Sequence, residues 1–347
     1  MLALTIEPGT PNSARLEQVA EPPERDGAVL VHTLAIGICG TDGHLVAGHD
    51  GTPPHGETRL ILGHESIGIV EDAPSDSGLA AGDLVVGIVR RPDPVPCMPC
   101  GIGEWDMCSN GLYTERGIKG RHGYASERFR IEPEFAVKVA PSLGHLGVLL
   151  EPASVLAKAW DHIRRIGGRA AWAPDRVLIT GAGPIGLLAA LMGVQQGYEV
   201  HVFDRNTSGS KPDLVRTLGA FYHSDLETVG FAPDIVLECT GATSVVLEVM
   251  TLTAPAGIVC LTGGPPRERI VSLDLGQFSR EMVTENSVIF GSVNANRRHF
   301  ELAADALARA DREWLDRLIS RRVPLAEWRQ ALQRRKGEVK VVLDFQA

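Results

Sequence analysis

Hydrophobic residues in the first 140 positions fall into short runs separated by polar turns. The clearest apolar runs lie at 28–37, 66–70 and 83–89, and glycine- and proline-rich segments separate them. Runs of this length between turn residues are typical of β-strands. We therefore predict a mostly β domain that extends to about residue 140.

After Pro141 the spacing of the apolar residues becomes helical over 147–166, and a loop follows at 167–175. From Arg176 onward, apolar runs alternate with helix-like stretches, which predicts a parallel sheet with crossover helices. The predicted strands are 176–181, 199–204, 234–241, 257–263 and 287–294; the predicted helices are 185–197, 210–220 and 242–254, followed by helices at 299–311 and 325–334 and a last strand at 338–345.

Composition narrows the class of protein. The 347 residues are enough for two domains, and 44% hydrophobic with 22% charged residues is ordinary for a folded protein. A formal net charge of −9 argues against nucleic acid or an anionic membrane surface as partner. The start of the chain lacks a basic leader followed by a long apolar core, so we expect no signal peptide and a cytoplasmic location. The uncharged stretch at 177–194 contains Gly181, Gly183, Pro184 and Gly186 near its start, which favours a strand–turn–helix over a membrane span.

A glycine-rich motif indicates a dinucleotide site. GAGPIG follows a predicted strand and opens a predicted helix; it supplies Gly181, Gly183, Pro184, Ile185 and Gly186. The glycines allow a tight turn and close approach of the backbone to a pyrophosphate at a helix N-terminus. The next strand ends in Asp204, near the offset expected for the acid that binds ribose hydroxyls, and Arg205 follows it. Asp204 favours NAD, whereas Arg205 could pair with a 2′-phosphate, so we expect NAD to be preferred and leave NADP open.

Residues suited to binding zinc are scattered through the first 151 positions. GICGTDGH carries Cys39, Thr41 and His44, and LGHESIG carries His64 and Glu65. Glu151 in LLEPAS directly follows an apolar run, where an unpaired charge would be costly. Sulfur, imidazole and carboxylate are suitable zinc ligands, and a catalytic zinc keeps one coordination position open.

These motifs resemble those of the zinc-dependent medium-chain dehydrogenases, and within them the archaeal-type glucose dehydrogenases. The resemblance rests on GICGTD, LGHESIGIV, DLVVGIVRRP, GLYTERGIKGRHGYASERF, LLEPAS, the glycine motif and GSVNANRRHFE, which occur in the family's order along nearly the whole chain. It implies an α/β protein in which a mostly β, GroES-like catalytic domain (1–155 with 293–347) accompanies a Rossmann domain with a doubly wound parallel sheet (156–292).

The resemblance also implies roles for particular residues. Cys39, His64 and Glu151 would bind the catalytic zinc, with Glu65 beside it as an exchangeable carboxylate. Thr41 would hydrogen-bond the reacting hydroxyl, and His44 stands where alcohol dehydrogenases carry a proton-relay histidine. Glu115 and Asn294 would contact sugar hydroxyls or the nicotinamide end of the cofactor.

The activity implied is oxidation of C1 of an aldose, with glucose expected, to an aldonolactone with NAD(P). Other polyols, aminocyclitols and secondary alcohols remain as alternative substrates. A zinc-free quinone or enone reductase and a non-catalytic nucleotide sensor remain as alternative functions, and the Cys/His/Glu set argues against both. The family further implies a homodimer or homotetramer with a small sugar or polyol as substrate.

One motif departs from the family. CMPCGIGEWDMC holds three of the chain's six cysteines, Cys97, Cys100 and Cys108. The family's structural zinc lobe uses four cysteines spaced C-x2-C-x2-C-x7-C, and the first place falls here on Pro94, beside Asp93. Asp93 could supply an oxygen if the loop shifts. Two hypotheses therefore stand for this stretch: a second, structural zinc, or a metal-free loop with free thiols.

Overall fold

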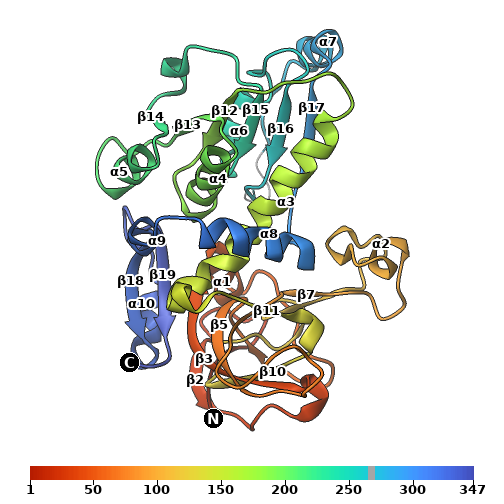
Figure 1. The fold of residues 1–347 in the computed structure, drawn as a ribbon, viewed down its shortest axis with the longest axis vertical. Coiled ribbons are helices and arrows are strands. Elements are labelled where there is room, and N and C mark those ends of the chain that lie inside the picture. The colour runs from red at the N-terminus through yellow and green to blue at the C-terminus, as the bar shows by residue number, and fades with distance from the viewer. Residues whose placement is uncertain (265–269) are drawn as a thin grey trace. The chain divides into compact units, whose positions relative to one another are not determined.

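The computed structural model describes residues 1–264 and 270–347, and the chain divides into two compact units (Figure 1). Unit 1 comprises Met1–Ser154 and Asn294–Ala347, and unit 2 comprises Val155–Val293. No helix among the described residues combines the length and the apolar character needed to cross a membrane.

Unit 1 is built on three β-sheets. The largest runs β11-β6-β5-β3-β19-β18, with β10 also paired to β3, and the two small sheets run β2-β1-β4 and β7-β8-β9. The strands are β1 (Leu2–Ile6), β2 (Arg15–Gln18), β3 (Val29–Ile38), β4 (Leu60–Ile61), β5 (Glu65–Asp72), β6 (Leu84–Gly87), β7 (Arg90–Arg91), β8 (Thr114–Arg116), β9 (Gly120–Arg121), β10 (Arg128–Ile131), β11 (Ala136–Lys138), β18 (Ile319–Pro324) and β19 (Lys340–Asp344).

Helices of unit 1 are mostly short. They are α1 (Gly40–Val46), α2 (Met98–Gly101), α8 (Arg297–Ala308), α9 (Arg312–Leu318) and α10 (Trp328–Ala331), with short 3-10 helices at Glu24–Asp26, Trp105–Met107, Pro133–Phe135, Pro141–Leu149 and Leu325–Glu327. The C-terminal strand β19 pairs antiparallel with β3 over Val341–Asp344, so the end of the chain completes the sheet that the N-terminal part begins.

Unit 2 holds one parallel sheet of six strands in the order β14-β13-β12-β15-β16-β17. The strands are β12 (Arg176–Thr180), β13 (Glu199–Phe203), β14 (Phe221–His223), β15 (Ile235–Glu238), β16 (Ile258–Leu261) and β17 (Val288–Gly291), and the helices are α4 (Pro184–Gln195), α5 (Ser210–Thr217), α6 (Thr243–Val249), α7 (Leu275–Glu285) and most of α3 (Leu150–Gly167), with a 3-10 turn at Leu226–Val229. Counted in chain order this is 3-2-1-4-5-6, the order of doubly wound dinucleotide-binding sheets.

The central strands of the unit 2 sheet, β12, β15 and β16, are mostly apolar and buried, as expected where helices cover a parallel sheet. In β12 and β15, Leu178 and Val236 are fully buried in a core that Val249 and Val259 complete. The predicted parallel sheet with crossover helices is confirmed, with each predicted strand within a few residues of its observed bounds.

Candidate metal centre and nucleotide site

Cys39 is held at the junction of a strand and a helix. It directly follows β3 and is the N-cap of α1. Its sulfur accepts a hydrogen bond from the Thr41 N–H at 3.2 Å, and the Asp42 carboxylate accepts one from the Cys39 N–H at 2.9 Å. This reciprocal cap satisfies donors at the start of the helix and thereby fixes the direction of the thiol.

His64 reaches the same point from the neighbouring strand. It directly precedes β5, whose first residue pairs with Gly37 of β3, so the two strands bring His64 beside Cys39. His64 Nε2 lies 3.0 Å from Cys39 Sγ, and His64 Nδ1 lies 3.5 Å from Asp42 Oδ1. A carboxylate behind the second ring nitrogen is the arrangement that orients a metal-binding imidazole.

Glu65 is the third member of the cluster. Ligand atoms of Cys39, His64 and Glu65 all lie within 4.8 Å of one another. Glu65 forms an ion pair with Lys340 of β19, and the side chains of both are almost fully buried. A Cβ at Gly37 would lie 2.1 Å from Glu65 Oε2, so a side chain there would displace this carboxylate from its present position.

Negative charge surrounds the imidazole of His64. Burial alone would lower the pKa of His64, but the charges of Cys39, Asp42 and Glu151 hold this pKa well above its ordinary value. Glu151 lies in the first turn of α3, and burial raises its pKa to about 7, reinforced by the charge of Glu65. Glu151 therefore interacts electrostatically with His64 and Glu65. Its carboxylate oxygen is not part of the compact Cys39–His64–Glu65 group.

The donor set fits a divalent zinc ion. Sulfur, imidazole nitrogen and carboxylate oxygen converge from three residues, and zinc accepts all three atom types. Metal binding requires a deprotonated thiol and an imidazole that is free at the binding nitrogen, so a cation would take the place of the proton that the surrounding negative charges favour on His64.

The other residues predicted for substrate contact form a second group in unit 1. Asn294 Nδ2 donates to Glu115 Oε1 at 2.9 Å, and Arg90 donates to the same oxygen through Nε at 3.1 Å and Nη2 at 2.9 Å. Asn294 adopts a left-handed backbone conformation with φ of 61°. His44 lies exposed on α1, where its ring and that of His49 are nearly perpendicular, with the ring centroids 6.3 Å apart.

Three residues of these groups had no role in the sequence prediction: Asp42, Arg90 and Lys340. Signals for them are present in the sequence. Asp42 stands three residues after Cys39, as the acid of a capping box does, and Lys340 stands between the apolar residues Val339 and Val341 of the predicted terminal strand. Arg90 lies in the RRP segment that entered the family resemblance only as a motif.

The three cysteines of the lobe lie close together. Sulfur atoms of Cys97, Cys100 and Cys108 fall within 4.8 Å of one another. Cys97 accepts a hydrogen bond from the Ser109 N–H at 3.4 Å, and hydrogen bonds lower the pKa of Cys97 to about 6, whereas burial raises the pKa of Cys100 to about 12. Asp93 is buried and donates its N–H to Cys100 Sγ at 3.5 Å, but its carboxylate is outside the three-sulfur group.

In unit 2, the glycine motif forms the turn between β12 and α4. Gly181 has φ of 92°, and a Cβ at Gly186 would lie 1.7 Å from the Gly181 carbonyl oxygen. Only glycine allows this close approach of helix to strand. Gly183 is the N-cap of α4, with Pro184 and Ile185 in the first turn, so free N–H groups of the helix start face the space beside the turn.

Asp204 lies directly after β13 and contacts that turn. Its Oδ2 accepts the Ala182 N–H at 2.8 Å and lies 3.3 Å from Lys211 Nζ, and its Oδ1 accepts the Asn206 N–H at 3.0 Å. Although burial would raise it, these contacts hold the pKa of Asp204 below its ordinary value. Arg205, next in the chain, is exposed.

Comparisons with known proteins agree with this geometry. The sequence model of the family described as "Glucose dehydrogenase C-terminus" matches residues 144–345, and that of "Alcohol dehydrogenase GroES-like domain" matches residues 25–141. A glucose 1-dehydrogenase of Methanocella arvoryzae is 40% identical over 100% of both chains. Glucose 1-dehydrogenase 1 of Caldivirga maquilingensis is 38% identical over 99% of each.

Solved structures show the same similarity. The structure of Haloferax mediterranei glucose dehydrogenase in complex with NADP, Zn and gluconolactone has a TM-score of 0.91 and 32% sequence identity, with 100% of each chain covered. A putative zinc-binding dehydrogenase of Sinorhizobium meliloti bound to NADP has a TM-score of 0.82 and 27% identity, with 99% of this chain and 98% of that one covered. The predicted fold class, a GroES-like mostly β domain with a Rossmann domain, is confirmed.

Proposed function

The chain belongs to the glucose dehydrogenase family of the zinc-dependent medium-chain dehydrogenases, and from this premise we propose that it oxidises C1 of an aldose, D-glucose, with NAD(P). The observation that carries the proposal is the Cys39–His64 pair with the buried carboxylates Glu65 and Glu151 acting on the same cluster, in a chain that also holds the dinucleotide turn. The hydrogen on C1 leaves as a hydride to the nicotinamide, the C1 hydroxyl loses its proton, and an aldonolactone results.

Cys39, His64 and Glu151 would hold the catalytic zinc. Glu65 is adjacent, but its carboxylate is already paired with Lys340, which favours Glu151 as the carboxylate ligand and Glu65 as the exchangeable neighbour. Bound zinc supplies a Lewis acid that favours loss of the proton from a hydroxyl. Asp42 keeps the His64 ring oriented, so the binding nitrogen faces the Cys39 sulfur.

Thr41 and the Arg90–Glu115–Asn294 group would handle the substrate. The Thr41 hydroxyl, two residues after Cys39, would accept the proton of the C1 hydroxyl or pass it outward, with His44 as a further relay. Arg90 and Asn294 hold the Glu115 carboxylate in one orientation, which leaves its second oxygen to accept hydrogen bonds from sugar hydroxyls. This carboxylate oxygen of Glu115 would discriminate sugars from simple alcohols. A simple alcohol lacks the additional hydroxyl groups and would leave the oxygen without a hydrogen-bond donor.

For the nucleotide, we propose that NAD is preferred and NADP accepted. Asp204 accepts ribose hydroxyls and disfavours a 2′-phosphate, whereas Lys211 beside it and exposed Arg205 reduce that penalty. In this assignment unit 2 binds the nucleotide and unit 1 binds zinc and sugar, which corresponds to domains 156–292 and 1–155 with 293–347.

Three finer features also belong to the proposal. The enzyme would act in the cytoplasm. It would form a homodimer or homotetramer, and sedimentation velocity measures that oligomeric state directly. The Cys97–Cys100–Cys108 cluster would bind a second zinc, because three sulfurs already converge there. Two zinc ions per chain by elemental analysis support this assignment, and one per chain leaves the lobe free of metal.

The test of the activity is a substrate panel with the full-length protein. We expect reduction of NAD and NADP with D-glucose and little rate with simple secondary alcohols, loss of that rate after chelation, and gluconolactone as the product. Oxidation of secondary alcohols without a response to any aldose would refute the sugar assignment. A sorbitol rate above the glucose rate would assign the enzyme to polyols instead.

A further inference from the structure

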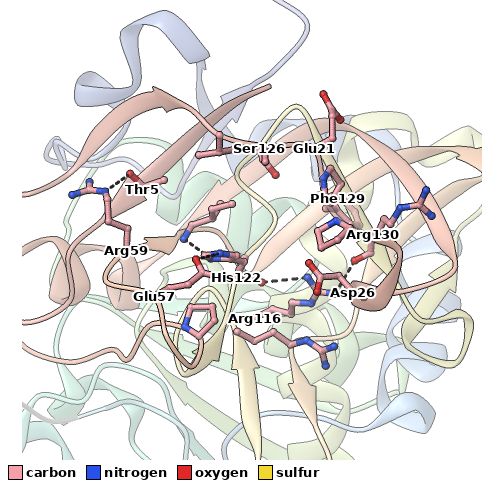
Figure 2. Close-up of a pocket in the computed structure, with 18 of the residues that line it drawn as sticks. Thr5, Glu21, Asp26, Glu57, Arg59, Arg116, His122, Ser126, Phe129 and Arg130 are labelled. Atoms are coloured by element: carbon pink, nitrogen blue, oxygen red, sulfur yellow. Dashed lines mark hydrogen bonds and ion pairs between the residues drawn. The ribbon is translucent and has the colours of Figure 1, made fainter.

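Unit 1 contains a cavity that the proposed activity does not use. Its volume is about 830 Å³, and residues of the β1–β2 hairpin, the segment around Asp26, the segment 54–61, the β8–β9 region and β10 line it (Figure 2). Cys39, His64, Glu151, Glu115 and Asn294 are not among the lining residues. A volume of this size falls in the range of small-molecule sites.

The lining carries an excess of positive charge. Six arginines and four acids line the cavity; the arginines are Arg25, Arg59, Arg116, Arg121, Arg128 and Arg130, and the acids are Glu17, Glu21, Asp26 and Glu57. Three of the acids already contact a basic group: Glu17 contacts Arg59, Glu21 contacts Arg128, and Glu57 contacts His122. Two acids outside the lining pair with further arginines: Glu132 lies 2.6 Å from Arg121, and Glu71 lies 2.8 Å from Arg128. Arg25 and Arg130 have no ion pair among the described residues, so the cavity keeps uncompensated positive charge that would favour an anion.

Two of the arginines, Arg116 and Arg130, each have one buried N–H group, the Nε–H, without a hydrogen-bond partner among the described residues. Arg116, with its side chain 3% exposed, donates to the carbonyls of His122, Asp26 and Arg130, and Figure 2 shows Arg116, Asp26 and His122 together on one wall. Burial, together with the charges of Arg91 and Arg121, lowers the pKa of Arg116 to about 10, although the Glu132 carboxylate lies 3.8 Å away.

The strand β8 separates this cavity from the group expected to contact sugar. Successive side chains of a strand point to opposite faces. Glu115 faces Arg90 and Asn294, whereas Thr114 and Arg116, its neighbours on either side, line the cavity. The cavity is therefore a separate compartment on the opposite face of the strand that carries Glu115.

We propose that this cavity binds a phosphate monoester carried on a polyhydroxylated body, such as a sugar phosphate. A phosphate dianion carries more charge and more acceptor oxygens than a carboxylate. It can therefore accept hydrogen bonds from several guanidinium groups at once. Asp26 and the Thr114 hydroxyl, also in the lining, can pair with the hydroxyl groups of the ligand body. The cavity is larger than a free phosphate ion, so we expect the phosphate to be attached to a larger, hydroxyl-bearing body.

The test is isothermal titration calorimetry of the full-length protein with sorbitol 6-phosphate, which lacks an anomeric hydroxyl and so is not the proposed substrate. Saturating NADPH fills the nucleotide turn of unit 2 during the titration. Sorbitol and inorganic phosphate are the matched probes without phosphate and without the hydroxyl-bearing body. We expect one site per chain for sorbitol 6-phosphate, weaker binding of phosphate and no binding of sorbitol.

Substitutions locate the site. Arg130→Gln removes a lining guanidinium, and Arg25→Gln removes an exposed one at low risk to folding; each should weaken binding roughly tenfold, the usual cost of a lost hydrogen bond to a charged group. Arg309→Gln, on the exposed end of α8 and outside the cavity, should leave the affinity unchanged. Absence of binding, or binding that neither cavity variant weakens, would overturn the proposal. Equal affinity for inorganic phosphate would overturn the role of the hydroxyl-bearing body.

Discussion

Glu132 provides a quantitative test of the electrostatics of unit 1. It follows β10, and its Oε2 accepts hydrogen bonds from Arg91 through Nε at 3.0 Å and Nη2 at 2.9 Å. Arg121 lies 2.6 Å from its other oxygen, and Arg116 lies 3.8 Å away. The side chain of Glu132 is 23% exposed, so solvent screens these contacts only partly.

The magnitude follows from the pKa of this carboxyl. Burial would raise it, but Arg91, Arg121 and Arg116 together lower the pKa of Glu132 from 4.5 to about 2. At about 1.4 kcal/mol for each pKa unit, the ionised carboxylate contributes about 3 kcal/mol to stability at pH 7. A depressed folded-state pKa means that this stability is present above pH 4.5 and is lost as the pH falls through 4.5 toward 2.

Glu132→Gln should therefore lower the free energy of unfolding by about 3 kcal/mol at pH 7 and by about 2 kcal/mol at pH 3.5, where the wild-type group has begun to lose its advantage. The assay is urea unfolding followed by tryptophan fluorescence, because Trp105 packs on Phe135, whose ring also contacts Arg91. Arg297→Gln, which removes an exposed ion pair with Glu301, should cost less than about 1 kcal/mol and serves as control. A cost below about 1 kcal/mol for Glu132→Gln, or a cost that does not change with pH, would refute the reasoning.

Three further predictions concern the stability of the buried Glu65–Lys340 ion pair, the sugar contact at Glu115 and the choice of nucleotide. Lys340→Met leaves Glu65 buried without its cation, so the chelated protein should lose about 3 kcal/mol of stability in urea unfolding; an unchanged midpoint would contradict the pair. Glu115→Gln should lower kcat/KM for glucose about tenfold or more with little change in the KM for NAD, and an equal fall with every alcohol would contradict a sugar-specific role. Arg205→Ala should lower kcat/KM for NADP about tenfold and leave that for NAD unchanged; a parallel fall for both nucleotides would remove Arg205 from selectivity.

The sequence contains enough information to predict unit 2 almost completely. Its central strands are short, mostly apolar runs. The glycine turn at Gly181 can be recognised because the close contacts that require its glycines lie within a few residues of one another in the sequence. Strand β14 and helix α7 were not predicted: β14 is only Phe221–His223 and has no fully buried residue, and Leu275–Glu285 of α7 has no buried residue and few strong apolar positions.

Unit 1 was less predictable because its contacts join distant parts of the chain. The strand pair β3–β19 places Lys340 beside Glu65, a contact that depends on sheet register and that no local pattern specifies. The predicted ligands Cys39 and His64 do meet at 3.0 Å, and Glu65 joins them more closely than Glu151 does. A bound ion fixes ligand distances that residue spacing does not encode, so the position of Glu151 outside the compact group was not predictable from the sequence.

The central claim is that the metal held by Cys39 and His64 enables this chain to oxidise glucose. The most direct measurement is glucose-dependent reduction of NAD(P) by the chelated protein, by the same protein after zinc is restored, and by Cys39→Ser, with the zinc content of each sample determined in parallel. Activity should vanish on chelation, return with zinc, and stay absent in Cys39→Ser at equal protein concentration and with intact folding. Full glucose oxidation by the metal-free protein, or by Cys39→Ser without zinc at this centre, would contradict the account.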